Sequence, residues 1–177
     1  MDPGDGGNFV IAPQDGDLVQ LPMGGVGVHF KIDGERTSGS VAVVQHPVAP
    51  GAFALPHTHT KEDEISYVLE GRIGAEIDER EFAVEAGEYL FKPRGLKHAF
   101  WNPTDRPARL IEIIAPAGLE RFFRTMGTLH PVPGTADYER AMGLLAEIAV
   151  VTHFDERDAF FARHNLRAPA LAATGAR

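Results

Sequence analysis

The stretch that decides the fold runs from Gly51 to Gly71 and reads GAFALPHTHTKEDEISYVLEG. His57 and His59 are two residues apart, and side chains at this spacing point to the same face of a β-strand. A polar run, residues 60–63, is typical of a turn, and Glu64 follows it at the head of a second apolar strand. We therefore expect a hairpin that brings together two imidazoles and a carboxylate, three of the four ligands of a common transition-metal site.

A second stretch, Gly87 to Asn102, reads GEYLFKPRGLKHAFWN and offers the fourth ligand. His98 begins a short aromatic strand after a turn at Pro93–Gly95. Glu62 and Asp63 are the neighbours that could take the place of Glu64. We prefer Glu64 because it directly precedes the apolar strand.

The two stretches read Gly-x5-His-x-His-x4-Glu-x6-Gly and Gly-x5-Pro-x-Gly-x2-His-x3-Asn, with fifteen residues between them. At every fixed position they resemble the paired motifs of the cupin superfamily, over about Val41 to Ile114. The resemblance implies an all-β fold, an antiparallel double-stranded β-helix (the jelly-roll cupin barrel), with a C-terminal helical extension. It also implies a metal in the barrel mouth, held by His57, His59, Glu64 and His98.

The run HTHTKEDEISYVLEG looks most like the quercetin-dioxygenase-like group of cupins. This resemblance implies an oxidoreductase, a dioxygenase that acts on a small enol or flavonol-like aromatic substrate. Glu64 would be the catalytic residue that accepts the substrate hydroxyl proton. Two alternatives stay open, because a fold does not fix a function. One is an isomerase or lyase acting on a hydroxylated carbonyl compound, and the other is a non-catalytic cupin that binds a small molecule.

Three imidazoles and one carboxylate suit one divalent transition metal, because imidazole is the commonest ligand for such ions. Calcium and magnesium prefer more oxygen ligands. Iron, manganese, nickel, copper, cobalt and zinc all remain possible. Four protein ligands leave an open position on a five- or six-coordinate ion, as catalysis requires.

The chain has 177 residues, a net charge of −8 and no cysteine. An acidic balance argues against nucleic-acid and anionic-membrane partners, so we expect a small-molecule substrate instead. The N-terminal sequence lacks the features of a secretory signal, and a cytoplasmic location is therefore the default. The cupin resemblance further implies a homodimer that pairs through sheet edges and N-terminal strands.

We expect three parts: a flexible N-terminal arm (1–25), the cupin barrel (26–116) and a C-terminal helical extension (117–177). Pro47 and Pro50 suggest that the strand from Ser40 to Val48 ends at a sheet edge. The apolar spacing after Pro116 predicts helices over three segments, with Asp155 as the N-cap of the last one. These segments are Gly118–Leu129, Asp137–Val150 and Asp155–His164.

Other conspicuous residues have a structural and a functional interpretation. Five histidines are expected to be ordinary core or surface residues, with His46 the least certain of them: His29, His46, His130, His153 and His164. The predicted inward face of His98 also carries Phe100 and Asn102. In the first predicted helix, three apolar side chains either close the barrel or pack in its core: Phe122, Phe123 and Met126. Lys92, Arg94 and Lys97 either attract an anionic substrate or form a solvated loop.

Overall fold

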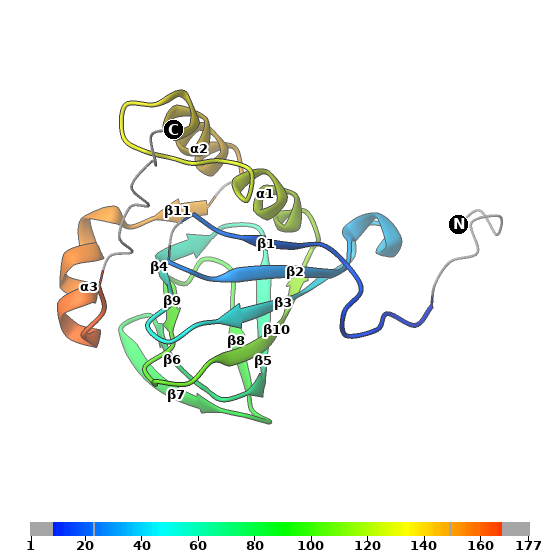
Figure 1. Ribbon diagram of the computed structural model, residues 1–177, viewed down its shortest axis with the longest axis horizontal. Helices are drawn as coiled ribbons and strands as arrows, with labels where there is room; N and C mark the ends of the chain where they lie inside the picture. The colour runs from blue at the N-terminus through cyan, green and yellow to red at the C-terminus, as the bar shows by residue number, and fades with distance from the viewer. Residues whose placement is uncertain (1–8, 23, 149, 168–177) are drawn as a thin grey trace, which may run out of the picture.

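The structure is a computed structural model of a single chain and describes residues 9–22, 24–148 and 150–167. Two antiparallel sheets pack face to face as a jelly roll (Figure 1). The six-stranded sheet has the order β1 (Leu18–Gln20), β2 (Gly27–Ile32), β3 (Ala42–Val48), β10 (Ala108–Ala115), β5 (Asp63–Glu70) and β8 (Tyr89–Lys92). The five-stranded sheet has the order β11 (Val150–Thr152), β4 (Phe53–His59), β9 (His98–Trp101), β6 (Arg72–Ile77) and β7 (Arg80–Glu85).

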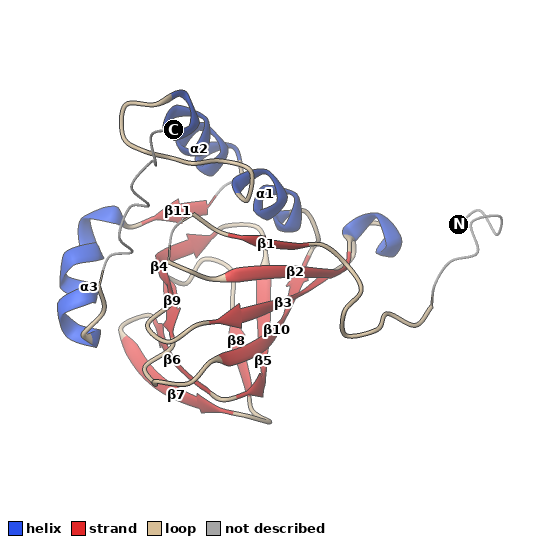
Figure 2. Cartoon of the chain, viewed as in Figure 1, coloured by secondary structure: helices blue, strands red, loops and turns tan. Residues whose placement is uncertain are grey.

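The predicted all-β fold with a C-terminal helical part is confirmed (Figure 2). Strand alternation builds the core, since every second residue of β10 and of β5 is buried between the sheets. The principal cluster joins apolar side chains of both sheets, among them Val68, Ile73, Leu90, Phe100 and Leu110. The expected homodimer stays a prediction, as do the limits of the three expected parts.

The hairpin expected from Gly51–Gly71 is wrong. β4 pairs with β9 and β11, whereas β5 pairs with β10 and β8 in the opposite sheet. The polar run after His59 therefore carries the chain from one sheet to the other. His57 lies opposite His98 in the β4–β9 pair, and Glu64 reaches them from the facing sheet.

The sheet edge expected near Pro47 is also wrong, because β3 lies inside the six-stranded sheet between β2 and β10. Pro47 is opposite Arg109 on β10, and it falls outside the β2–β3 pairs, which involve residues 43–45 of β3 and contain a register shift. The sheet thus tolerates a residue that cannot donate a hydrogen bond. At its other side β1, inside the expected N-terminal arm, pairs with β2 and extends the sheet.

Three α-helices lie in the expected C-terminal part: α1 (Leu119–Met126), α2 (Ala136–Glu147) and α3 (Arg157–His164). Two short 3₁₀ helices complete the described elements, η1 (Gly34–Thr37) and η2 (Phe154–Glu156). Helix α2 ends before Val150 because that residue begins β11, a strand that pairs with β4. Asp155 lies in η2 and caps nothing, so the predicted N-cap is wrong. No helix of the described residues is long and apolar enough to cross a membrane.

Helix α3 packs on the outer face of the five-stranded sheet, beside β9 and β6 (Figure 1). The ring of His164 stacks on Trp101 with centroids 3.7 Å apart, and Phe160 meets the same indole edge-on at 5.7 Å. The indole in turn covers Gly74 on β6, where a Cβ atom would lie 2.3 Å from Trp101 Cε2. Glycine at this position therefore lets the indole lie flat beneath the helix.

We predict that Gly74→Ala lowers the free energy of unfolding by about 1–3 kcal/mol, because the added methyl group displaces a packed indole. Urea unfolding of metal-free protein measures this change. Gly143→Ala is the matched control, because nothing lies within 4 Å of its Cβ position in α2. It should stabilise the helix by up to about 1 kcal/mol. Equal stability of the Gly74 variant and the wild type would contradict the account of how α3 is seated.

Candidate metal centre

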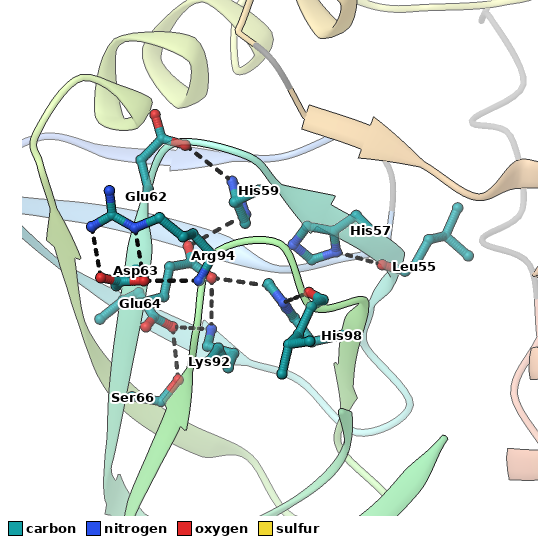
Figure 3. A network of polar contacts seen from close by, with 12 residues as sticks. Leu55, His57, His59, Glu62, Asp63, Glu64, Ser66, Lys92, Arg94 and His98 are labelled. Atoms are coloured by element: carbon teal, nitrogen blue, oxygen red, sulfur yellow. Dashed lines mark hydrogen bonds and ion pairs between the residues drawn. The ribbon is translucent and has the colours of Figure 1, made fainter. Parts of the chain in front are cut away.

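The four predicted ligands come together in the structure. One ligand atom from each of His57, His59, Glu64 and His98 lies within 4.8 Å of all the others. The His57 and His98 ring centroids are 4.4 Å apart, and those of His59 and His98 are 5.3 Å apart. Figure 3 shows the three imidazoles grouped beside Glu64. Sequence reasoning thus identified the whole cluster, although it assigned the wrong strand pairing.

Backbone carbonyls fix the orientation of two of the imidazoles. His57 Nδ1 lies 2.6 Å from the Leu55 carbonyl, and His98 Nδ1 lies 3.1 Å from the Leu96 carbonyl. Because a carbonyl only accepts, each Nδ1 carries the hydrogen and each Nε2 keeps a free lone pair. His98 Nε2 is buried and has no hydrogen-bond partner among the described residues; Glu64 Oε2 is 3.2 Å away but outside hydrogen-bond geometry. An orphaned lone pair with a fixed tautomer fits a metal ligand.

Neither alternative to Glu64 occupies its place. Asp63 accepts hydrogen bonds from the backbone and guanidinium of Arg94, which lower the pKa of its carboxyl to about 2. Glu62 lies beyond His59, with Oε2 3.7 Å from Nδ1, while Glu64 Oε1 lies 3.6 Å from Nε2 of the same ring. Glu62 therefore lies on the Nδ1 side of His59, whereas Glu64 lies on the Nε2 side and faces the cluster.

Two of the imidazoles, His57 and His98, are held neutral. Burial, followed by the neighbouring His98 and His59, keeps the pKa of His57 well below its ordinary value. Burial likewise lowers the pKa of His98. Neutral imidazole is the form that binds a metal, so the cluster needs no proton loss from these rings at neutral pH.

Glu64 is held as an anion by a lysine inside the barrel. Burial alone would raise the pKa of this carboxyl, but the Lys92 ammonium and then His59 outweigh burial and bring the pKa well below its usual range. Lys92 Nζ lies 2.9 Å from Glu64 Oε2 and 2.8 Å from Glu112 Oε2. These two carboxylates also raise the pKa of Lys92, against the opposing effect of its burial.

Sequence reasoning missed the residues that support Glu64. Lys92 was assigned to a possible solvated loop, yet its side chain is 2 % exposed. Glu112 lies at an inward position of β10, where Ser66 Oγ donates to its Oε2 at 2.8 Å. Burial raises the pKa of Glu112 to about 7. An acid at a buried position of an alternating apolar strand was the signal that could have found it.

The remaining loop cations are paired with carboxylates. Arg94 is bound to Asp63, and Lys97 Nζ lies 2.8 Å from both oxygens of Glu156. The two residues expected on the inward face with His98 have different roles. Phe100 lines the cavity beside the cluster, whereas Asn102 donates to the Val48 and Arg106 carbonyls and shapes the loop after β9.

A cavity of about 140 Å³ opens beside the cluster, and its surface is mostly apolar. An apolar cavity of about this volume admits one benzene-sized ring. The C-terminal part covers the barrel here, because side chains of α1, α2 and β11 line the cavity: Leu119, Phe122, Phe123, Met126, Leu145, Val150 and Thr152. The aromatic residues of α1 therefore line the cavity as well as joining the core.

Most of the other histidines have ordinary structural contacts. His29 bonds the Gly16 carbonyl, His153 bonds Thr58, and His164 lies 3.4 Å from Glu76 Oε2. His46 differs, because its ring also lines the cavity. Its Nδ1 lies 2.8 Å from the Gly27 carbonyl, and burial lowers its pKa to about 4.

Comparisons with known proteins agree with this fold. Residues 46–114 match the family described as "Cupin domain". The chain is 31 % identical over 100 residues to the tetracenomycin polyketide synthase protein TcmJ of Streptomyces glaucescens, covering 56 % of this chain and 65 % of that protein. It is 33 % identical over 67 residues to the polyketide synthase CurC of Streptomyces cyaneus, covering 38 % of this chain and 44 % of that protein. The chain thus spans about two thirds of one relative and less than half of the other.

Solved structures show the same architecture. A predicted oxalate decarboxylase from Thermotoga maritima aligns with a TM-score of 0.57 at 19 % identity, over 60 % of this chain and 98 % of that one. The polyketide cyclase RemF from Streptomyces resistomycificus aligns with a TM-score of 0.55 at 24 % identity, over 62 % of this chain and 80 % of that one. The domain match at residues 46–114 and the two-sheet fold together identify a cupin domain in this chain. The relatives named here do not support the finer resemblance to quercetin dioxygenases.

We predict that the purified protein binds about one divalent transition-metal ion per chain. His98→Ala removes a ligand and should weaken binding at least about 10-fold, the scale of even an indirect change at a metal site. Elemental analysis after dialysis against Zn²⁺, together with competition against a chelator, measures both quantities. Wild-type protein that takes up neither Zn²⁺, Fe²⁺, Mn²⁺ nor Ni²⁺ would overturn the assignment.

A second prediction concerns the stability of metal-free protein in acid. The pKa of His46 is about 4 in the folded chain and 6.5 at its ordinary value, a difference worth roughly 3 kcal/mol. Between these values the unfolded chain binds the proton, so stability is lost as the pH falls from about 6.5 to 4. In His46→Leu this loss should shrink by about the same amount in urea titrations. An unchanged loss would show that His46 is not held neutral by burial.

Proposed function

We propose that the protein is a metal-dependent cupin enzyme that acts on an enolic or phenolic substrate derived from a polyketide. One observation carries the proposal: the anionic Glu64 lines an apolar cavity of ring size together with His57 and His59, and the free lone pair of His98 Nε2 lies 3.2 Å from its Oε2. Such a cavity with a few convergent polar groups is the usual form of a small-molecule site. The substrate class is supported by the relatives, two of which are named as polyketide synthase proteins.

Glu64 is the residue that we propose moves a proton. When bound, a divalent ion supplies Lewis acidity, which makes the hydroxyl proton of an enol or phenol easier to remove. Lys92 keeps the Glu64 carboxylate anionic and therefore a weak base. A weak base suits a proton that is already acidic, because proton transfer is most efficient between groups of similar pKa. The apolar cavity wall excludes water from the transfer.

The first candidate reaction is a cyclisation or isomerisation of the enol, which moves protons without net oxidation. The second candidate is the dioxygenase reaction on a small enol or flavonol-like aromatic substrate. The donor set supports this second candidate, because three imidazoles and a carboxylate also bind redox-active ions such as iron, copper or manganese. Both reactions begin with the loss of the same proton to Glu64.

Oxygen consumption separates the two candidates. Protein loaded with Zn²⁺ or Fe²⁺ is incubated with a flavonol and, separately, with an aromatic poly-β-ketone, while an oxygen electrode and mass spectrometry follow the reaction. A cyclase changes the poly-β-ketone without consuming oxygen, and a dioxygenase consumes about one O₂ per substrate. Chelator-treated protein is the control. Tight binding of both compounds without any product would contradict an enzymatic function and favour a binding protein.

The variant Glu64→Gln separates the ligand role of this residue from its role as a base. If Glu64 is the base, metal-saturated variant should react about 10²–10⁴-fold more slowly than wild type. His98→Ala is the comparison, because that imidazole is only a ligand in this proposal, and excess metal should restore its activity. If metal-saturated Glu64→Gln matches the wild-type rate, Glu64 does not accept the proton.

A further inference from the structure

One buried carboxylate oxygen of Glu112 has no hydrogen-bond partner in the part of the chain that the structure describes. Glu112 is 1 % exposed and lines the cavity. Its Oε2 accepts hydrogen bonds from Ser66 Oγ and from Lys92 Nζ, each at 2.8 Å, but no group of the described residues donates to Oε1. Leaving a buried acceptor without a donor is unfavourable, so the position of Oε1 indicates that a ligand supplies the donor.

A second acceptor lies on the same inner face of the sheet. His46 is 4 % exposed, and its Nδ1 donates to the Gly27 carbonyl because a carbonyl cannot donate. The neutral ring therefore keeps a lone pair on Nε2. His46 lies opposite Leu110 in the β3–β10 pair, and Glu112 is two residues further along β10. Residues related in this way are diagonal neighbours, with Cα atoms about 7–8 Å apart.

The surface between these acceptors suits an aromatic ring. The Phe100 ring lines the cavity, with its centroid 6.3 Å from that of His46. Lys92 offers no free charge to a ligand carboxylate, because it is bound to Glu64 and Glu112. A ring that brings hydroxyl donors fits this lining, and a carboxylate does not.

We propose that Glu112 and His46 form a hydroxyl-recognition site, in which phenolic hydroxyl groups of an aromatic ligand donate to Glu112 Oε1 and His46 Nε2. The inference deepens the proposed function and rests on it, because it names polyhydroxylated aromatic rings as the substrate class. A ring bound in this way lies beside Glu64, which Lys92 links to Glu112. None of the four candidate metal ligands belongs to this site.

Binding of two small probes tests the site without requiring turnover. Resorcinol carries two hydroxyl donors, whereas 1,3-dimethoxybenzene has the same ring and only acceptors. NMR titrations of Zn²⁺-treated protein at about pH 8, above the pKa of about 7 for Glu112, give both dissociation constants. Resorcinol should bind at least about 10-fold more tightly, because a site built for a hydroxyl rejects an analogue that lacks it. Equal affinities would overturn the proposal.

Three variants test which residues cause the preference for resorcinol. Glu112→Gln keeps the size of the side chain and an oxygen for Ser66 and Lys92, but its amide turns the free acceptor into a donor. It should lose the preference for resorcinol or reverse it. His46→Leu should lower the preference at least about 3-fold without changing the buried ion pairs. Phe122→Leu is the matched control, because it alters only the apolar lining of the cavity and should weaken the binding of both probes equally.

Circular dichroism and Zn²⁺ content show that each variant is folded. If Glu112→Gln and His46→Leu are folded and still prefer resorcinol as strongly as the wild type does, the proposal is overturned, even if the enzyme turns over a polyketide. The opposite failure is distinguishable: intact probe preference in a protein that converts no enol or phenol would refute the proposed reaction and leave the recognition site standing.

Discussion

The ion pair between Lys92 and Glu64, 2.9 Å long and sealed inside the barrel, is the interaction on which the site depends. Both side chains are at most 5 % exposed, and Glu112 neutralises the remaining side of the same ammonium. Removing one partner from such a buried group typically costs about 3–5 kcal/mol, because it leaves an uncompensated charge. The three side chains therefore constrain one another, and Glu64 stays ionised where burial alone would have neutralised it.

This constraint connects the two sheets. Glu64, Lys92 and Glu112 belong to the six-stranded sheet, while the three imidazoles belong to β4 and β9 of the other sheet. The cluster therefore exists only when the jelly roll is closed. The C-terminal part adds a third element, because β11 pairs with β4 from Val150 opposite His59 to Thr152 opposite His57. The C-terminal part therefore both covers the cavity and pairs with β4, the strand that carries His57 and His59.

The sequence predicted the features that depend on local spacing. His57, His59, Glu64 and His98 were found because each position is fixed within a short motif, and the short aromatic strand predicted to begin at His98 is β9. Local spacing does not predict which distant strands pair with one another. The polar run after His59 is typical of a hairpin turn, but nothing local shows that it crosses between sheets.

The buried charges were missed for a related reason. Lys92 adjoins a proline–glycine turn, where a lysine is usually solvated, and only the facing Glu64 and Glu112 explain its burial. Glu112 was detectable as an acid within an apolar alternation, but its function depends on partners that are 20 and 46 residues away. The short strand β11 was not predicted, and its first residue, Val150, was given to a helix, because pairing with β4 decides the conformation of this segment.

The central claim is that these imidazoles and Glu64 form one metal centre, and anomalous diffraction tests it most directly. Crystals grown with Zn²⁺ are measured on both sides of the zinc absorption edge. The account predicts one strong anomalous peak in contact with His57, His59, Glu64 and His98. The absence of a peak there, or a peak only at the separate cluster that Glu76 of β6, Glu81 of β7 and His164 of α3 form, would contradict it.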